Sequence, residues 1–235
     1  MTVLASRDPL VADPSGGPRA LRLLGLSVVA LVATHWLRLL PLGFEAPGAT
    51  RYEDFVDLLT PYAVAGPALA ALAAVGASRR TWVVALLGAG AFTQGHGIHL
   101  SANSIRHALG SAPPVDLWDE RVGHWVWFVG LVVLASAVVH AVAGVVPPAR
   151  SGPALAALVG LTWAANVVEA GSVPLGVVLA GGLLVQGWRR RGTPTGRLLV
   201  LAFGLALVLV AAWGAWFGGF PQPSELGWLS RPLTR

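Results

Sequence analysis

Residues 198–217 read LLVLAFGLALVLVAAWGAWF, an unbroken apolar run of 20 residues. A helix needs about 20 apolar residues to cross the hydrocarbon core of a bilayer. Similar runs recur along the chain, in which 55% of the 235 residues are hydrophobic and 11% are charged. A soluble domain normally carries about 25% charged residues. The sequence therefore predicts an integral membrane protein and excludes a disordered chain, a disulfide scaffold and a nucleic-acid-binding domain.

Seven segments are long and apolar enough to be expected as membrane-spanning helices, and they lie near residues 21–42, 56–77, 81–105, 118–146, 153–170, 172–188 and 196–219. The fifth and sixth are separated only by the turn Gly171-Ser172-Val173-Pro174. One helix across both would be about 52 Å long, well beyond the ~30 Å hydrocarbon core, so two short spans are predicted. We expect an all-α polytopic bundle of about seven helices, forming a single domain over 21–219 between a cytoplasmic tail (1–20) and an extracytoplasmic tail (220–235).

The basic residues orient these helices. All 16 of them are arginine, and the formal net charge is +5. With the amino terminus inside, the inner segments hold Arg7, Arg19, Arg22, Arg79, Arg80, Arg150, Arg189, Arg190, Arg191 and Arg197, while nine of the eleven acids fall outside. Because arginine accumulates on the cytoplasmic side of membrane proteins, we expect a cytoplasmic amino terminus and an extracytoplasmic carboxyl terminus at the cell membrane.

The first polar stripe lies near the outer end of the third span. Residues 94–107 read QGHGIHLSANSIRH. On a helix, His96, His99, Asn103 and His107 fall within an arc of about 80°. Glycine stands on either side of His96, and glycine lets a neighbouring helix approach the backbone closely. The segment therefore predicts one polar helix face that meets a neighbouring element.

The second polar stripe opens the fourth span, in DLWDERVGHW at residues 116–125. Asp116, Glu120 and His124 follow one another at four-residue intervals and are expected to share a helix face, with Asp119 beside them pointing elsewhere. The third and fourth spans are joined by a short loop, so they are expected to be antiparallel neighbours. The two stripes should then meet at one height.

Imidazole and carboxylate groups gathered in this way are typical metal ligands. The predicted ligands are His96, His99, Glu120 and His124, with His35 completing the set. The absence of cysteine excludes thiolate ligands. Imidazole and carboxylate ligands suit a divalent transition metal, with Zn or Fe expected first and Cu or Mn next. Metal-bound histidine needs an acceptor for its other ring nitrogen, and the predicted supporting residues are Asn103, Ser101, Asp116 and His107.

Glu169 ends the fifth span on the same side, three residues after Asn166. A partly desolvated carboxylate there can act as a general acid or base, and Asp119 is the other candidate. These residues predict a metal-dependent membrane enzyme whose site opens at the outer interface and takes a lipid or amphipathic substrate, by hydrolysis or oxidation.

Other interpretations stay open at this stage. The chain could be a metal or haem carrier or redox protein, with His35 paired to His96 or His124 as haem ligands. It could be a metal-free carboxylate enzyme such as a membrane isoprenoid cyclase, or a non-catalytic subunit that contacts a membrane partner protein or a second copy of itself. Polar packing and helix caps also account for interfacial His and Asp, and Glu53, Asp54 and Asp57 are more typical of a solvated helix start. The carboxyl-terminal tail, with Trp228, could lie along the interface or cover the site.

Overall fold

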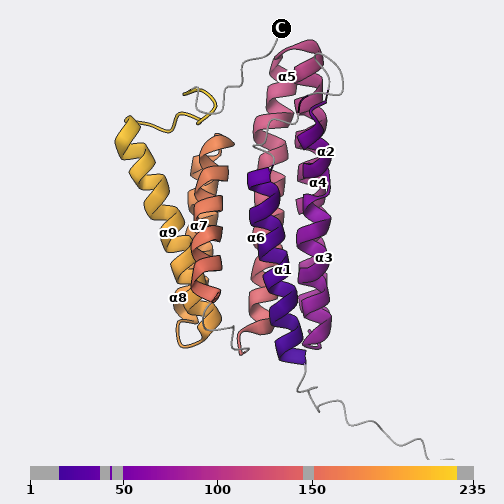
Figure 1. Cartoon of the computed structure of the whole chain (residues 1–235), viewed down its shortest axis with the longest axis vertical. Helices are drawn as coiled ribbons and strands as arrows, with labels where there is room; N and C mark the ends of the chain where they lie inside the picture. The colour runs from indigo at the N-terminus through magenta and orange to yellow at the C-terminus, as the bar shows by residue number, and fades with distance from the viewer. Residues whose placement is uncertain (1–15, 38–42, 44–49, 145–150, 227–235) are drawn as a thin grey trace, which may run out of the picture.

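A computed structural model describes residues 16–37, 43, 50–144 and 151–226, and every regular element in these ranges is a helix. The helices form an elongated bundle in which successive long segments run in opposite directions (Figure 1). They are α1 (Gly16–Leu37), α2 (Tyr52–Leu58), α3 (Thr60–Ala74), α4 (Arg79–Leu109), α5 (Pro113–Asp116), the π-helix η1 (Leu117–Gly123), α6 (His124–Val142), α7 (Gly152–Glu169), α8 (Val173–Arg189) and α9 (Pro194–Phe217).

Five helical segments are long and apolar enough to cross a membrane: α1, Tyr52–Ala74, Pro113–Val142, α7 and α9. The predicted all-α fold is therefore confirmed, and these five helices fit a helical membrane bundle. The two remaining long helices differ from these five, because α8 has only 17 residues and α4 carries the polar stripe. The prediction of two separate helices around the 171–174 turn is also confirmed, because Gly171, at φ +57°, breaks the chain between α7 and α8.

The ends of the helices follow from local sequence. The Ser78 hydroxyl accepts the backbone N–H of Thr81 at the start of α4, and the Thr193 hydroxyl accepts that of Gly196 at the start of α9. Such caps satisfy N–H groups that have no partner within the helix. Proline in the first turn of α3, α7, α8 and α9 fits the same position, where its missing N–H costs nothing.

The α4–α6 pair is the tightest helix contact that bears on the polar stripes. Gly88 and Gly95 of α4 alternate with Gly123 of η1 and Gly130 of α6 along the seam, and both pairs are seven residues apart. A β-carbon at any of the four would collide with backbone atoms of the opposite helix. The two backbones are therefore in direct contact, as small residues permit in membrane helix pairs.

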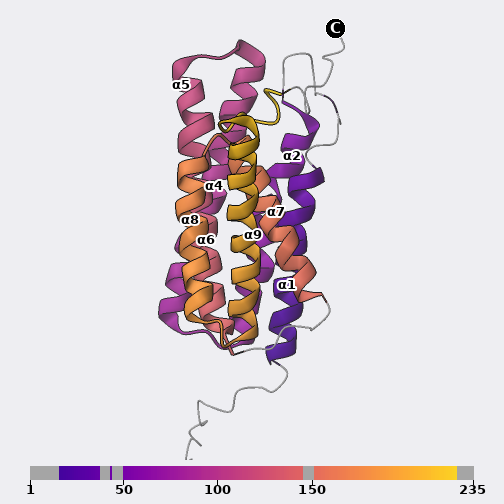
Figure 2. The ribbon, with the colours of Figure 1, turned by 90° about the vertical axis from the view of Figure 1, so that its left-hand side faces the viewer.

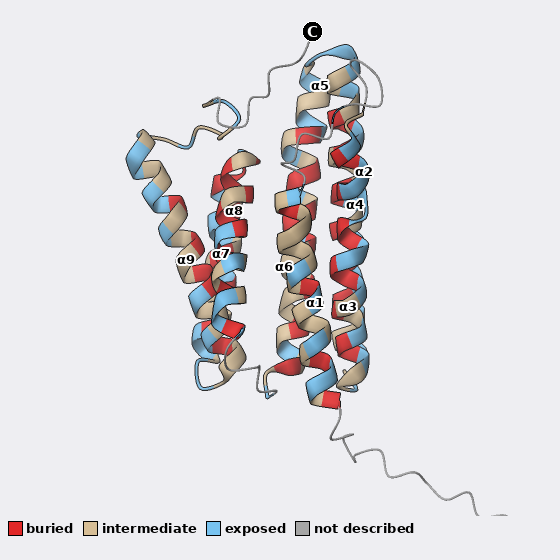
Figure 3. Cartoon of the chain, viewed as in Figure 1, coloured by how far each residue is buried: buried red, intermediate tan, exposed pale blue. Residues whose placement is uncertain are grey.

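The helices α7, α8 and α9 form a second group beside α1, α3, α4 and α6 (Figure 1), and in the turned view this second group faces the viewer (Figure 2). Two contacts join the groups near the middle: Trp36 Nε1 donates to Thr162 Oγ1 at 3.1 Å, and the rings of Phe128 and Trp163 lie 5.3 Å apart. Buried residues line the facing sides of the helices, while exposed residues cover the outward faces (Figure 3). Exposed leucine and valine on those faces fit a lipid environment.

Charge divides the bundle into two ends. Eight described arginines stand at the ends of α1, α4, α8 and α9 that lie together at the foot of Figure 1, which we call the arginine end: Arg19, Arg22, Arg79, Arg80, Arg189, Arg190, Arg191 and Arg197. The described acids lie towards the opposite end, which we call the cluster end: Glu53, Asp54, Asp57, Asp116, Asp119, Glu120, Glu169 and Glu225. The separation agrees with the charge pattern from which the orientation was predicted.

Two glycines on α4 make a matched pair for testing the close contact. Gly95→Ala places a methyl group against the Trp127 backbone, whereas Gly97→Ala meets nothing within 4 Å. We expect Gly95→Ala to lower the free energy of unfolding by about 1–3 kcal/mol, the usual cost of overpacking. Gly97→Ala should raise it by about 0.5–1 kcal/mol through helix propensity. Equal effects in an SDS-titration unfolding assay in mixed micelles would contradict the backbone contact.

Candidate acid-base site

The π-helix η1 decides which carboxylate faces the histidines. Asp119 is 1% exposed and lies against His99, whereas the side chain of Glu120 is 32% exposed and pairs with Arg106. The expectation that Asp119 points away from the two polar stripes is therefore wrong. Asp116 and Glu120, expected to share a helix face, both contact Arg106.

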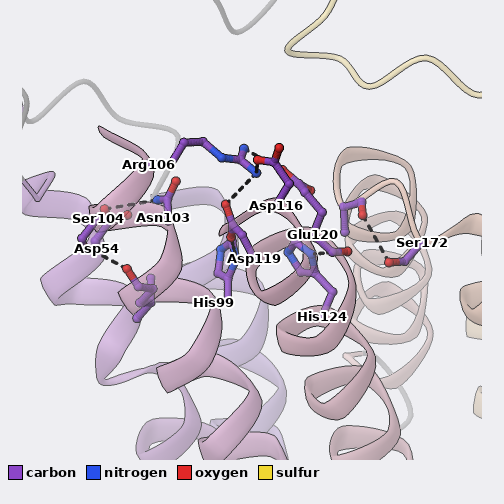
Figure 4. Close-up of polar contacts among 12 residues, drawn as sticks. Asp54, His99, Asn103, Ser104, Arg106, Asp116, Asp119, Glu120, His124 and Ser172 are labelled. Carbon is purple, nitrogen blue, oxygen red and sulfur yellow. Dashed lines mark hydrogen bonds and ion pairs between the residues drawn. The ribbon is translucent and has the colours of Figure 1, made fainter. Parts of the chain in front are cut away.

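Arg106, near the end of α4, holds three acids of α5 and η1 together, and we call these four residues the Arg106 cluster (Figure 4). Its guanidinium lies 3.0 Å from Asp119 Oδ2, 2.7 Å from Glu120 Oε1 and 3.2 Å from Asp116 Oδ1. The Asp119 side chain is only 2% exposed, while that of Arg106 is 28% exposed. A buried carboxylate is thus neutralised by a cation that reaches it from the surface, an arrangement that reduces the cost of burying the charge.

His99 and His124 lie beneath the Arg106 cluster. His99 Nδ1 is 2.6 Å from Asp119 Oδ1, so the two side chains form an ion pair when the imidazole is protonated. His124 Nδ1 lies 3.2 Å from the backbone oxygen of Glu120. The centroids of the two imidazole rings are 4.4 Å apart. Because a carbonyl oxygen can only accept a hydrogen bond, this contact places the proton of the neutral His124 ring on Nδ1 and makes Nε2 its basic nitrogen.

His96 has a different acidic neighbour, Asp57 at the end of α2. His96 Nε2 lies 3.7 Å from Asp57 Oδ1, and the Thr60 hydroxyl donates to the same oxygen at 2.9 Å. These residues border a small cavity of about 10 Å³, which we call the central cavity; it is lined by Leu31, Thr34, His35, Asp57, Thr60, His96, Trp127 and Asn166. The predicted site is therefore divided into His99 and His124 near the Arg106 cluster and His35 and His96 at the central cavity.

The acids of α2 are buried rather than solvated, contrary to expectation. Glu53, Asp54 and Asp57 are 1–5% exposed. Asp54 pairs with Arg51 and accepts a hydrogen bond from Asn103 Nδ2 at 3.4 Å. Their three- and four-residue spacing on one short helix was the available signal, but only the packing of α2 against α1 and α4 shows that this face points inward.

Two other predicted supporting residues lie away from the histidines. Ser101 is exposed and borders an open groove of about 650 Å³ between α4 and η1, on the face of α4 opposite the histidine stripe. His107 is half-buried in the last turns of α4.

Glu169 contacts the tail. Its Oε2 accepts the backbone N–H of Ser224 at 3.2 Å, and Trp213 Nε1 donates to the Pro221 oxygen at 3.1 Å. The described part of the tail therefore lies against the ends of α7 and α9. Trp228 falls outside the described residues, so the predicted lid is not tested. The polar residue that α7 contributes to the central cavity is Asn166.

Two titrating groups at the end of α4, beyond the predicted span 81–105, have shifted pKa values. Burial alone would lower the pKa of Arg106, but the hydrogen bond to Glu120 and the charges of Asp119 and Asp116 raise it overall, so this guanidinium stays charged. Burial, together with the positive charge of Arg51, lowers the pKa of His107, so its imidazole is neutral at pH 7.

The histidines and acids do not lie together as the predicted metal and haem sites require. Within the described ranges, no group of three or more His, Asp or Glu residues is arranged to hold a metal ion. Glu120 is paired with Arg106, and His35 and His96 belong to the separate central cavity. That cavity has room for about one water molecule, so a haem between His35 and His96 would require the helices to part.

No protein-family model, curated protein or solved structure matches the chain.

Arg106 can be tested against Arg121, an exposed arginine in η1. We expect Arg106→Gln to lower the free energy of unfolding by about 3 kcal/mol, because it leaves the Asp119 carboxylate buried without its cation. Arg121→Gln should change it by less than about 0.5 kcal/mol, as surface substitutions do. Adding Asp119→Asn to Arg106→Gln should restore part of the loss in the same assay, and a strictly additive further loss would contradict the pairing.

Proposed function

We propose that this chain is an integral membrane enzyme that carries out general acid-base chemistry on a lipid or other amphipathic substrate at the cluster end. The observation that carries the proposal is the Arg106–Asp119–His99 arrangement. The buried carboxylate of Asp119 contacts the Arg106 guanidinium on one side and the partly exposed His99 imidazole on the other. A titratable base oriented by a third group is the usual construction of a proton-transfer site.

Each residue has a separate role in this proposal. His99 is the group that takes and returns the proton, because its side chain is 13% exposed and lies against the Asp119 carboxylate. Asp119 positions the ring and stabilises the imidazolium that forms, while Arg106 keeps Asp119 ionised. His124, whose ring lies 4.4 Å from that of His99, lies within reach of the same substrate.

The proposed location follows from the charge distribution. We propose that the bundle spans the cell membrane about seven times, with the arginine end in the cytoplasm and the cluster end on the extracytoplasmic side. The eight described arginines at the arginine end support this orientation. We propose a lipid-like substrate because a molecule that partitions into the bilayer can reach residues at the ends of apolar helices.

The proposal is tested by comparing membrane lipids. Cells that express the wild-type chain, His99→Gln or no chain are extracted and analysed by untargeted lipid mass spectrometry. We expect at least one lipid to accumulate or disappear with the wild-type chain, and its rate of conversion to fall by about 10²–10⁴-fold in His99→Gln, the usual contribution of a general base.

His140→Gln is the matched control, because His140 lies at the other end of α6 and contacts Arg190 instead of the site. It should retain the wild-type lipid profile. If extracts from wild-type, His99→Gln and non-expressing cells cannot be distinguished, while both proteins are present in the membrane in equal amounts, the proposed activity is wrong.

A metal ion at His99 and His124 is the second candidate. The observation that favours it is that the two rings lie 4.4 Å apart and that the Nδ1 atom of His124 contacts a carbonyl oxygen, the usual arrangement behind a metal-bound imidazole. The described residues offer two imidazoles there rather than the three protein donors that a catalytic zinc site normally has. We therefore assign no chemical step to a metal.

Elemental analysis of the detergent-purified chain separates the two candidates. The acid-base proposal expects no stoichiometric transition metal that depends on these rings. The metal candidate expects about one ion per chain in the wild type and none in His99→Ala/His124→Ala, with His140→Ala as the control. Equal metal content in both variants would dismiss a site at these two histidines.

A further inference from the structure

The central cavity lies where α1, α2, α3, α4, α6 and α7 meet, away from the Arg106 cluster. Its volume is about 10 Å³. A cavity of roughly 10–15 Å³ on this measure holds one water molecule, provided that the water finds two to four polar partners. The cavity is bordered by two imidazoles, one carboxylate, two hydroxyls, an amide and an indole, so such partners surround it.

Two residues that border the cavity, His96 and Trp127, are 2% and 4% exposed. Each has a buried nitrogen, His96 Nδ1 and Trp127 Nε1, that has no hydrogen-bond partner among the described residues. Leaving a buried polar group unpaired destabilises the folded state. The indole nitrogens of three other tryptophans do have acceptors: those of Trp36, Trp163 and Trp213 each donate to a protein oxygen at 3.1–3.3 Å.

The chemistry of the two nitrogens specifies what can bind between them. The Trp127 indole N–H can only donate, so the ligand must accept a hydrogen bond. His96 Nε2 faces the Asp57 carboxylate, which favours the proton on Nε2 and leaves Nδ1 as an acceptor. The ligand must therefore also donate, and it must be no larger than one water molecule.

We propose that the central cavity is a water-binding proton-transfer site, in which one water molecule accepts from Trp127 Nε1 and donates to His96 Nδ1. Asp57 is the positioning residue, held by the Thr60 hydroxyl. When this water carries an excess proton, its O–H bond breaks as the Nδ1–H bond forms. The products are a neutral water and an imidazolium that faces the Asp57 carboxylate, and the reverse step returns the proton.

This inference does not depend on the enzymatic proposal, because it concerns His96 rather than His99. The test uses the full chain in lipid nanodiscs, with ¹⁵N-labelled tryptophan and histidine. The Trp127 and His96 signals are assigned by their disappearance in Trp127→Phe and His96→Gln. We expect a magnetisation-transfer cross-peak between bound water and the Trp127 indole proton, and a neutral His96 ring that is protonated on Nε2.

Trp163→Phe is the matched control, because Trp163 is also buried in the aromatic core but donates to the Gly176 oxygen. The cross-peak between bound water and the Trp127 indole proton should be retained in Trp163→Phe. A Trp127 indole proton without water contact, or a neutral His96 protonated on Nδ1, would overturn the proposal. The wild-type spectrum decides these two points even if Trp127→Phe does not fold.

Discussion

The direct contact between the backbones of α4 and the η1–α6 segment is the constraint on which the polar site depends. Four glycines, alternating between the two helices, remove the side chains that would otherwise hold the axes apart. The short connection through α5 then brings the end of α4 against η1. Because the separation is so small, His99 reaches Asp119 and the rings of His99 and His124 lie side by side. In a wider helix pair, His99, His124 and Asp119 would face lipid or be separated by water. The charge of the Asp119 carboxylate would then have no opposite charge beside it.

The two acid-base pairs use this contact in different ways. His99 and Asp119 lie near the surface, where Arg106 supplies the opposite charge and solvent can exchange protons. His96 and Asp57 lie within the bundle, where α2 brings its acids between α1 and α4 and aromatic rings enclose the imidazole. The first arrangement suits proton transfer to a substrate that arrives from the membrane or the solvent. The second suits proton exchange with a single enclosed molecule.

Much of the fold could be predicted from the sequence, because apolar length alone specifies spanning helices and the 171–174 turn marks the boundary between α7 and α8. The histidines and acids were recognised as candidates because ionisable residues are rare in such segments. Their partners could not be predicted. Helical periodicity placed Asp116, Glu120 and His124 on one face, and it gave no indication that Asp119 would lie against His99. The burial of Asp57, and its approach to His96, depends on how α2 packs between helices distant in sequence. The sequence showed Arg106 only as one of the 16 arginines. Its pairing with three acids depends on how α4 packs against the segment that carries them.

The most direct test of this account is a solid-state NMR measurement of the carboxylate neighbour of His99, on the wild-type chain in lipid with ¹⁵N-labelled histidine and ¹³C-labelled aspartate and glutamate. The account predicts a strong dipolar coupling between His99 Nδ1 and the Asp119 carboxylate carbon, assigned by its loss in Asp119→Asn, and none to Glu120. Coupling to the Glu120 carboxylate instead, or to neither acid, would show that the segment does not present Asp119 to the histidines and would contradict the acid-base site.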